Sequence, residues 1–250
     1  MSTPVEEMKV LGLHAVFALF EKRPEAMRKL YLTQEVSKPL GPVMKYCAAH
    51  KRAYKVTTAE ELERISGSSH HEGVCLMAQR PRIWSVEEYC ATQLQTPHSL
   101  LALEGVANPH NLGALMRVAA NFGVQGILME NASQAFNGAT WRTAEGGGEW
   151  LDFVDCSSFK AAFAHLRKTG FRVYSTSSHI GHEPSPAEFS SRSLFLFGSE
   201  AHGLTSESIR LGDGILCIPS SGHVESLNVA CAAGIILHEW YKKARSIKAS

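Results

Sequence analysis

Three clusters of polar and glycine residues in the second half of this chain could support chemistry, and each follows an apolar stretch. They are residues 108–117 (NPHNLGALMR), 197–204 (FGSEAHGL) and 218–229 (IPSSGHVESLNV). Together they supply amide, guanidinium, carboxylate and hydroxyl groups, which can orient a ligand and take part in proton transfer. The first two clusters lack the GxGxxG and GKS/GKT loops, so they give no support to hydride transfer or nucleotide hydrolysis.

The first cluster reads as the beginning of a helix. Asn111 can cap that helix, and Gly113 and Arg117, which are four residues apart, share one helical face. The glycine leaves room beside the guanidinium, as a ligand would require. A capped helix with a surface arginine is the plainer interpretation of the same residues.

The other two clusters read as loops at strand ends. Gly198 lets a ligand approach the backbone, and Glu200 can accept from a hydroxyl or pair with an arginine, although a turn with a solvated glutamate is the alternative. Ser226 and Asn228 reach one ligand only where the backbone is still entering a helix, and simple N-capping by Ser226 is the alternative. The joint occurrence of all three clusters at successive strand ends favours one shared site.

The elements that must position these clusters form an alternating pattern over residues 99–250. Short apolar runs separated by helices predict a parallel sheet covered on both faces, and such sheets bind ligands at the carboxyl ends of their strands. The predicted strands are 100–105, 124–130, 151–155, 171–175, 193–197 and 215–218, and the predicted helices are 111–122, 157–169 and 229–245.

Residues 1–80 predict a smaller α/β unit. Its expected helices are 10–21, 39–50 and 59–65, and its expected strands are 29–33, 53–57 and 73–78. Thr58 supplies an N-cap oxygen to the third helix. Residues 81–98 are expected to be the linker between the units. Proline breaks at Arg80–Pro81 and Thr96–Pro97 mark its two ends, and one short helical turn is expected at 85–91.

Composition limits the class of protein. The chain has 250 residues, 44% hydrophobic, with a net charge of +1, so disorder is excluded, and its longest uncharged apolar run, 229–237, is far shorter than the roughly 20 residues of a membrane span. The six cysteines show neither CxxC pairs nor a histidine at metal spacing, which predicts reduced, buried thiols, no metal site and a cytoplasmic protein. Neither half of the chain is strongly basic and there is no basic tail, so charge alone does not predict binding to nucleic acid. An RNA-binding surface would have to arise on folding or oligomerisation.

In order and spacing, the three clusters resemble the three motifs of the SpoU (TrmH-type) RNA ribose 2'-O-methyltransferases of the SPOUT superfamily. The blocks GLHAVFALFEKRPEAMRKLYLT and SSHHEGVCLMAQ resemble the L30e-like substrate-binding domain that precedes the catalytic domain in the rRNA-modifying branch. The resemblance covers roughly residues 9–245. It implies an α/β fold in which an L30e-like domain at 1–80 precedes a parallel-sheet methyltransferase domain at 99–250 with a C-terminal trefoil knot.

The resemblance also implies S-adenosylmethionine as cofactor, a ribose 2'-hydroxyl as methyl acceptor and a role for each matching position. The positions that match the family's catalytic residues are Asn111, Arg117, Glu200, Ser226 and Asn228. The positions that match its cofactor-binding residues are Thr176, Gly198, Ile218 and Leu227. The pKa of a guanidinium is above about 12, so the arginine stays protonated at ordinary pH. Binding a phosphate and stabilising an alkoxide are therefore physically easier roles for it than that of a general base.

The chain departs from the family's usual residues at a few positions. Asn108 stands where Asp is frequent, Ala144 where Ser is usual, and Ala230 and Cys231 where a Ser-containing pair is commoner. By the same resemblance the partners are RNA, with rRNA favoured over tRNA, and a second copy of the chain bound through the catalytic domain. An RNA-binding ribosome-assembly factor of the same fold without turnover is the alternative function, and a nucleotide-dependent oxidoreductase lacks its glycine fingerprint.

Overall fold

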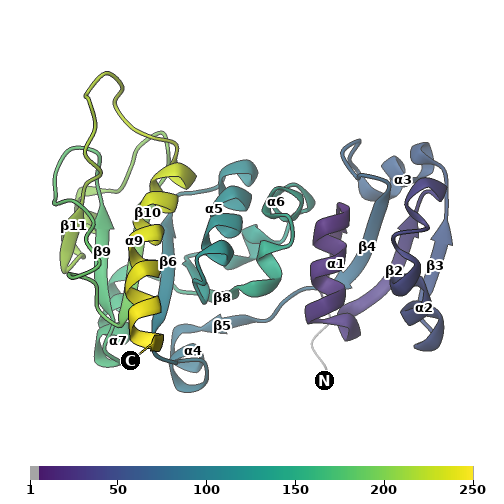
Figure 1. The fold of residues 1–250 in the computed structure, drawn as a ribbon, viewed down its shortest axis with the longest axis horizontal. Helices are drawn as coiled ribbons and strands as arrows, with labels where there is room; N and C mark the ends of the chain where they lie inside the picture. Colours follow the sequence, from purple (N-terminus) through teal and green to yellow (C-terminus); the bar gives the residue numbers. More distant parts are fainter. Residues whose placement is uncertain (1–5, 250) are drawn as a thin grey trace.

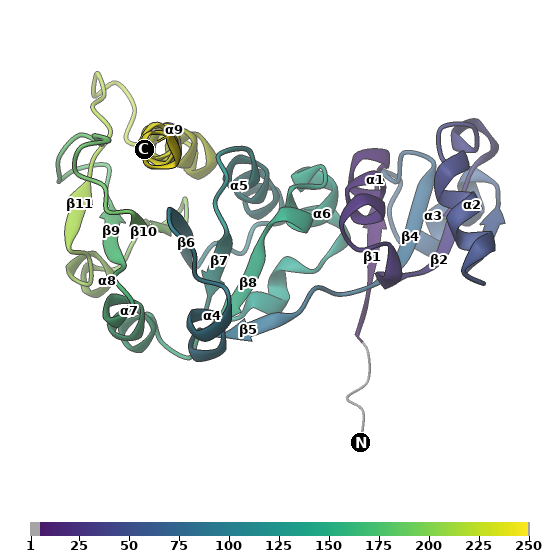
Figure 2. The ribbon, with the colours of Figure 1, turned by 60° about the horizontal axis from the view of Figure 1, so that its bottom comes forward.

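The computed structural model describes residues 6–249 and contains two α/β units side by side, each with its own sheet (Figure 1). The first sheet has the strand order β1-β4-β2-β3, and the second has the order β11-β9-β10-β6-β7-β8-β5. The helix α1 of the first unit lies against α6 of the second (Figure 2). The two units therefore share a packed interface.

The first unit follows the sequence pattern with one correction. Its elements are β1 (Glu7–Leu11), α1 (Leu13–Lys22), β2 (Met27–Leu32), α2 (Gly41–Ala49), β3 (Ala53–Val56), α3 (Ala59–Ser66) and β4 (Val74–Gln79). The helix expected over 10–21 begins only at Leu13, because the residues before it form β1 and pair antiparallel with β4. The predicted cap is confirmed, since the Glu61 N–H donates to Oγ1 of Thr58 over 3.2 Å.

The second unit has the predicted parallel sheet. Its elements are β5 (Ile83–Ser85), α4 (Val86–Thr92), β6 (His98–Glu104), α5 (Pro109–Asn121), β7 (Gly126–Met129), α6 (Gly138–Ala144), β8 (Asp152–Asp155), α7 (Phe159–Lys168), β9 (Arg172–Thr176), β10 (Arg192–Gly198), α8 (Ser206–Arg210), β11 (Gly214–Leu216) and α9 (Val229–Ala249). All the paired strands of this sheet run parallel.

Helices cover this sheet on both faces, with α5, α6 and α9 on one and α4, α7 and α8 on the other (Figure 2). The strand β6 shows why, because all its central residues are apolar and buried. Leu101 and Leu103 join the core that includes α5 and α9, whereas Leu100 and Ala102 join the core that includes α7. Because successive side chains of a strand point to opposite faces, such a continuous apolar run requires cover on both.

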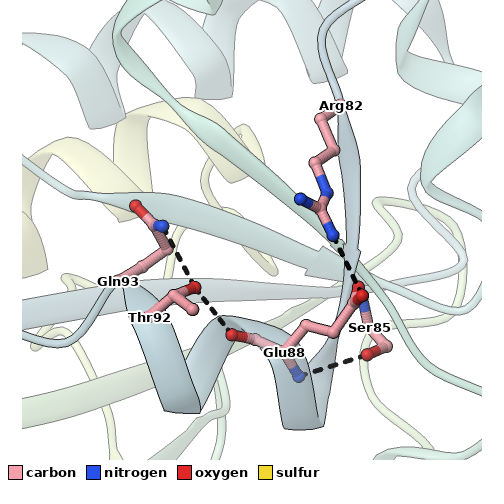
Figure 3. Close-up of polar contacts among 5 residues, drawn as sticks. All are labelled: Arg82, Ser85, Glu88, Thr92 and Gln93. Atoms are coloured by element: carbon pink, nitrogen blue, oxygen red, sulfur yellow. Dashed lines mark hydrogen bonds and ion pairs between the residues drawn. The ribbon is translucent and has the colours of Figure 1, made fainter.

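The segment 81–98 is not the linker that we expected from its proline breaks. It forms β5, which pairs with β8 at the edge of the large sheet, and α4. Ser85 and Glu88 make a reciprocal capping box at the start of α4, and Arg82 Nη2 lies 2.9 Å from Glu88 Oε1 (Figure 3). The capping box stabilises the short helix α4. The buried Tyr89 of α4 anchors the helix to the core that includes α7. The chain therefore enters the second unit before residue 83.

Several other expectations concern single residues. All six cysteines are free, but Cys231 is exposed and Cys90 and Cys217 are only partly buried, so the prediction of uniformly buried thiols is wrong. Within residues 6–249, no cluster of three or more His, Cys, Asp or Glu side chains could hold a metal ion. No helix in the described part of the chain is long and apolar enough to cross a membrane.

Candidate active site

Asn228 brings the three polar clusters together. Its Nδ2 donates to Asn111 Oδ1 over 3.2 Å and also to Oε1 of Glu200. Asn111 lies in the first turn of α5, Glu200 follows β10, and Asn228 precedes α9. Both helices start at the carboxyl ends of parallel strands, which is the edge where such sheets bind ligands (Figure 1).

The helix caps explain why these side chains are free to meet. Asn108, and not Asn111, caps α5, because its Oδ1 accepts from the His110 N–H over 2.9 Å. At α9 the cap is Asn228 and not Ser226, since the Ala230 N–H donates to Asn228 Oδ1 over 2.9 Å. The helix thus occupies the oxygen of the Asn228 amide and turns its NH₂ group toward the other two residues.

The turn that carries Glu200 is fixed at both ends. A Cβ at Gly198 would lie 2.1 Å from the carbonyl carbon of Gly203, so only glycine fits beneath this turn. The Gly203 N–H donates to the Ser199 carbonyl over 2.8 Å, and Gly203 itself has a φ of 64°. The glycine at position 198 is therefore required by the chain's own turn.

Glu104 holds the far end of that turn, and we did not identify it from the sequence. Its carboxylate accepts from the Thr205 N–H over 2.9 Å and from the Thr205 hydroxyl over 3.2 Å, and it also accepts from the Ser208 hydroxyl. The available signal was a carboxylate that directly follows the apolar run 100–103 at the end of a strand. Such a residue fits an anchoring role as well as a catalytic one.

Arg117 makes its ion pair outside this cluster. Its Nη1 lies 2.8 Å from Oε1 of Glu145, a residue that follows α6. Gly113 does not leave room beside the guanidinium as expected, because a Cβ there would lie 2.5 Å from the Thr140 carbonyl oxygen of α6. The glycine therefore serves the packing of α5 against α6.

The positions expected to bind a cofactor lie at neighbouring strand ends. Thr176 ends β9, Gly198 ends β10, and Ile218 follows β11, and these three strands are adjacent in the sheet. Thr176 donates its hydroxyl to the Leu196 carbonyl over 2.9 Å. Leu227 is an exposed apolar side chain in the loop before α9, where a ligand could cover it.

Ser226 lies in the same exposed loop as Leu227, and the structure does not bring it into the contact between Asn111, Glu200 and Asn228. Of the five residues expected to be catalytic, three are therefore in hydrogen-bond contact. The fourth, Arg117, is an exposed cation on the same helix as Asn111.

Two family models match the chain. One is described as the SpoU rRNA Methylase family and matches residues 98–238. The other is described as RNA 2'-O ribose methyltransferase substrate binding and matches residues 9–84. Together the matched ranges include most of both sheets.

The chain is similar to several curated bacterial proteins over nearly its whole length. It is 33% identical to the "Uncharacterized tRNA/rRNA methyltransferase YfiF" of Escherichia coli O157:H7, over 96% of this chain and 70% of that protein. It is 30% identical to the 23S rRNA (guanosine-2'-O-)-methyltransferase RlmB of Shewanella oneidensis, over 95% of this chain and 98% of that protein.

Solved structures agree on the fold. An rRNA methyltransferase from Sinorhizobium meliloti matches with a TM-score of 0.77 at 21% identity, over 95% of this chain and 88% of that one. The SpoU methyltransferase AviRb from Streptomyces viridochromogenes, in complex with AdoMet, matches with a TM-score of 0.75 at 21% identity, over 96% of this chain and 91% of that one. At these identities the likeness establishes the fold.

Proposed function

The chain belongs to the SpoU rRNA methylase family, and from this premise we propose that it transfers a methyl group from S-adenosylmethionine to a ribose 2'-hydroxyl of structured RNA. The observation that carries this proposal is the contact of Asn228 with Asn111 and Glu200. It joins one side chain from each of three motifs at the carboxyl edge of the sheet.

The proposed chemistry depends mainly on positioning. A ribose 2'-hydroxyl is a weak nucleophile that must lose its proton while it is aligned with the methyl group. S-adenosylmethionine, when bound, supplies that methyl group in electrophilic form on its sulfonium. Glu200 can accept a hydrogen bond from the hydroxyl, and Asn228 orients the Glu200 carboxylate by donating to its Oε1.

Arg117 is proposed to bind a phosphate beside the target ribose and to stabilise the developing alkoxide. The guanidinium suits both tasks because it remains charged and presents several donors in one plane. Ser226 is proposed to reach the same ligand from the loop before α9, which is exposed and therefore accessible.

The cofactor is proposed to lie against the ends of β9, β10 and β11, held by backbone groups of Gly198, Ile218 and Leu227 with Thr176 as a wall. The adjacent strand ends and the exposed apolar Leu227 support this placement. We also propose that the chain from β11 to α9 forms the trefoil knot of the family, which would bring these loops together.

The RNA is proposed to be rRNA in preference to tRNA, because residues 9–84 match a substrate-binding model and the relatives named RlmB act on 23S rRNA. The working form is proposed to be a cytoplasmic homodimer formed through the catalytic domain. The exposed Ile235 and Tyr241 on α9 support this, since a pair of large apolar side chains on one helix is suited to an interface.

Methyl transfer to total RNA from cells that lack the gene tests the proposal. Purified protein with methyl-labelled S-adenosylmethionine should label this RNA. The phosphodiester bond next to each labelled ribose should resist alkali, because a 2'-O-methyl group blocks the hydroxyl that alkaline cleavage needs. An Asn111→Ala variant is the inactive control. Binding of RNA and S-adenosylhomocysteine without any transfer would instead support the assembly-factor alternative, and binding of NAD(H) in calorimetry would contradict the family's cofactor.

A further inference from the structure

The segment Glu145–Trp150, of sequence EGGGEW, connects Arg117 with the substrate-binding unit. On one side it lies directly along α5. Oε1 of Glu145 lies 2.8 Å from Nη1 of Arg117, and a Cβ at Gly147 would lie 3.0 Å from the Arg117 Cα. Glu145 is therefore held next to the arginine by the backbone packing of its own segment.

On its other side the same segment is fixed to the first unit. A Cβ at Gly146 would lie 2.6 Å from the Ala18 Cβ of α1. Arg23 makes two hydrogen bonds of 2.6 and 2.9 Å to the fully buried carboxylate of Glu149, and the Lys22 ammonium lies 3.1 Å from the centre of the Trp150 ring. These contacts anchor the segment, so the place of Glu145 beside Arg117 is set by the domain interface.

The ion pair itself is weak enough to be exchanged. The side chains of Arg117 and Glu145 are 58% and 43% exposed, and ion pairs in such surroundings contribute little net stability because water screens them. Glu145 also has a φ of 46°, a left-handed conformation that glutamate adopts rarely. The pair is thus a poor candidate for a stabilising contact.

The arginine's proposed ligand carries the same sign of charge as Glu145. A phosphate offers a guanidinium two oxygens in the geometry that a carboxylate offers, and RNA brings that phosphate together with many other contacts. Resting on the proposed function, we propose that Glu145 is a positioning residue that pairs with Arg117 while the RNA site is empty and gives the guanidinium up to an RNA phosphate. In this scheme Glu145 competes with the substrate, and the domain interface fixes the competitor in place.

Replacement of Glu145 by Gln tests the proposal by the separation of KM from kcat. With total RNA from cells that lack the gene, the KM for RNA should fall about two- to five-fold, the range expected for release of one exposed ion pair, and kcat should stay within two-fold of the wild type. Glu87→Gln on α4, which covers the opposite face of the sheet, is the matched control for the loss of one negative charge and should leave KM unchanged. Glu145→Asn removes the same charge with a residue that tolerates the left-handed conformation, so it serves if the Gln variant folds poorly.

A double-mutant cycle decides whether the effect passes through Arg117. In an Arg117→Gln background, Glu145→Gln should no longer change RNA affinity in filter binding, because no guanidinium remains to be released. The proposal is overturned if KM is unchanged or rises in Glu145→Gln, if Glu87→Gln lowers it equally, or if the gain in affinity persists without Arg117. Filter binding needs no methyl transfer, so a failure of the proposed activity would appear separately, as wild-type protein that binds RNA without labelling it.

Discussion

The side-chain amide of Asn228 donates to Oδ1 of Asn111 over 3.2 Å and so joins two residues that are 117 positions apart in the chain. The direction of this bond is set by α9, whose Ala230 N–H occupies the Asn228 oxygen over 2.9 Å. One side chain thus caps a helix with one end and orients a site with the other. Its two roles can be separated by substitution.

Asn228→Asp should remove catalysis and leave the helix cap in place. Aspartate caps helices as well as asparagine does, but its second oxygen would face Glu200 and Asn111 Oδ1 as an acceptor where a donor is needed. We expect methyl transfer to fall by about 100-fold or more, as for the loss of one positioned donor in other enzymes. The melting temperature should change little.

Asn228→Ala is the comparison, because it removes both roles. It should lose activity and also about 1 kcal/mol of stability with the cap. Thermal melting and methyl transfer measured side by side check both variants. Wild-type turnover in Asn228→Asp would show that the contact with Glu200 has no part in the reaction.

Gly113→Ala should destabilise the protein although alanine favours helices. The new Cβ would lie 2.5 Å from the Thr140 carbonyl and 2.6 Å from the Thr143 Cβ, so α5 and α6 would have to separate. We expect a loss of about 1–3 kcal/mol in urea unfolding, as for other overpacked sites. Gly234→Ala is the matched control in α9, where the nearest atom would be Val118 Cγ1 at 3.9 Å, and it should gain up to about 1 kcal/mol. Equal stability changes in the two variants would contradict the close packing of α5 on α6.

The large sheet could be predicted because its strands are continuous apolar runs that have no other stable environment. The two strands that were missed, β1 and β5, are edge strands that are too short to be told from the helices that follow them. β1 alternates buried and exposed positions around Lys9, and β5 has only three residues. Tertiary pairing, rather than local preference, makes both of them strands.

The sequence singled out Asn111, Glu200 and Asn228, which meet in the structure, but it did not predict the contacts among them. Asn108 and Asn111 are chemically equal candidates for one cap, as are Ser226 and Asn228 for another, and only the backbone geometry decides between them. The pairing of Arg117 with Glu145 has no signal in the sequence. It depends on a glycine-rich segment that follows α6 in the chain and packs along α5.

Ile235→Glu should convert the proposed dimer into a monomer. Ile235 is 43% exposed on α9 in the catalytic domain, where a partner subunit would cover it and a buried unpaired carboxylate would be costly. Sedimentation velocity at micromolar concentration should give a dimer for the wild type and a monomer for the variant. Ile180→Glu, at a 52% exposed side chain between β9 and β10, is the control and should remain dimeric. A monomeric wild type would contradict the proposed assembly.

His98 should make the protein less stable in acid. It is fully buried at the start of β6, where burial, with a smaller effect from the nearby Arg192, lowers its pKa to about 4. Its Nδ1 accepts from the Gln95 N–H over 3.3 Å, and its Nε2 lies 2.9 Å from the Tyr89 hydroxyl, so the neutral ring satisfies both contacts with one proton. A second proton, on Nδ1, would place an N–H donor of the ring against the N–H donor of Gln95.

The sign of the pH effect follows from these pKa values. In the unfolded chain His98 titrates near its ordinary pKa of about 6.5, so below that pH the unfolded state binds a proton that the folded state does not. The free energy of unfolding should therefore decrease between pH 6.5 and pH 4 by about 3 kcal/mol from this residue alone.

A His98→Gln variant keeps a neutral donor and acceptor and lacks this titration. Urea unfolding at several pH values should show it less stable than the wild type at pH 7.5, with the difference shrinking steadily toward pH 4.5. A difference that stays constant over this range would mean that His98 does not titrate abnormally in the folded protein.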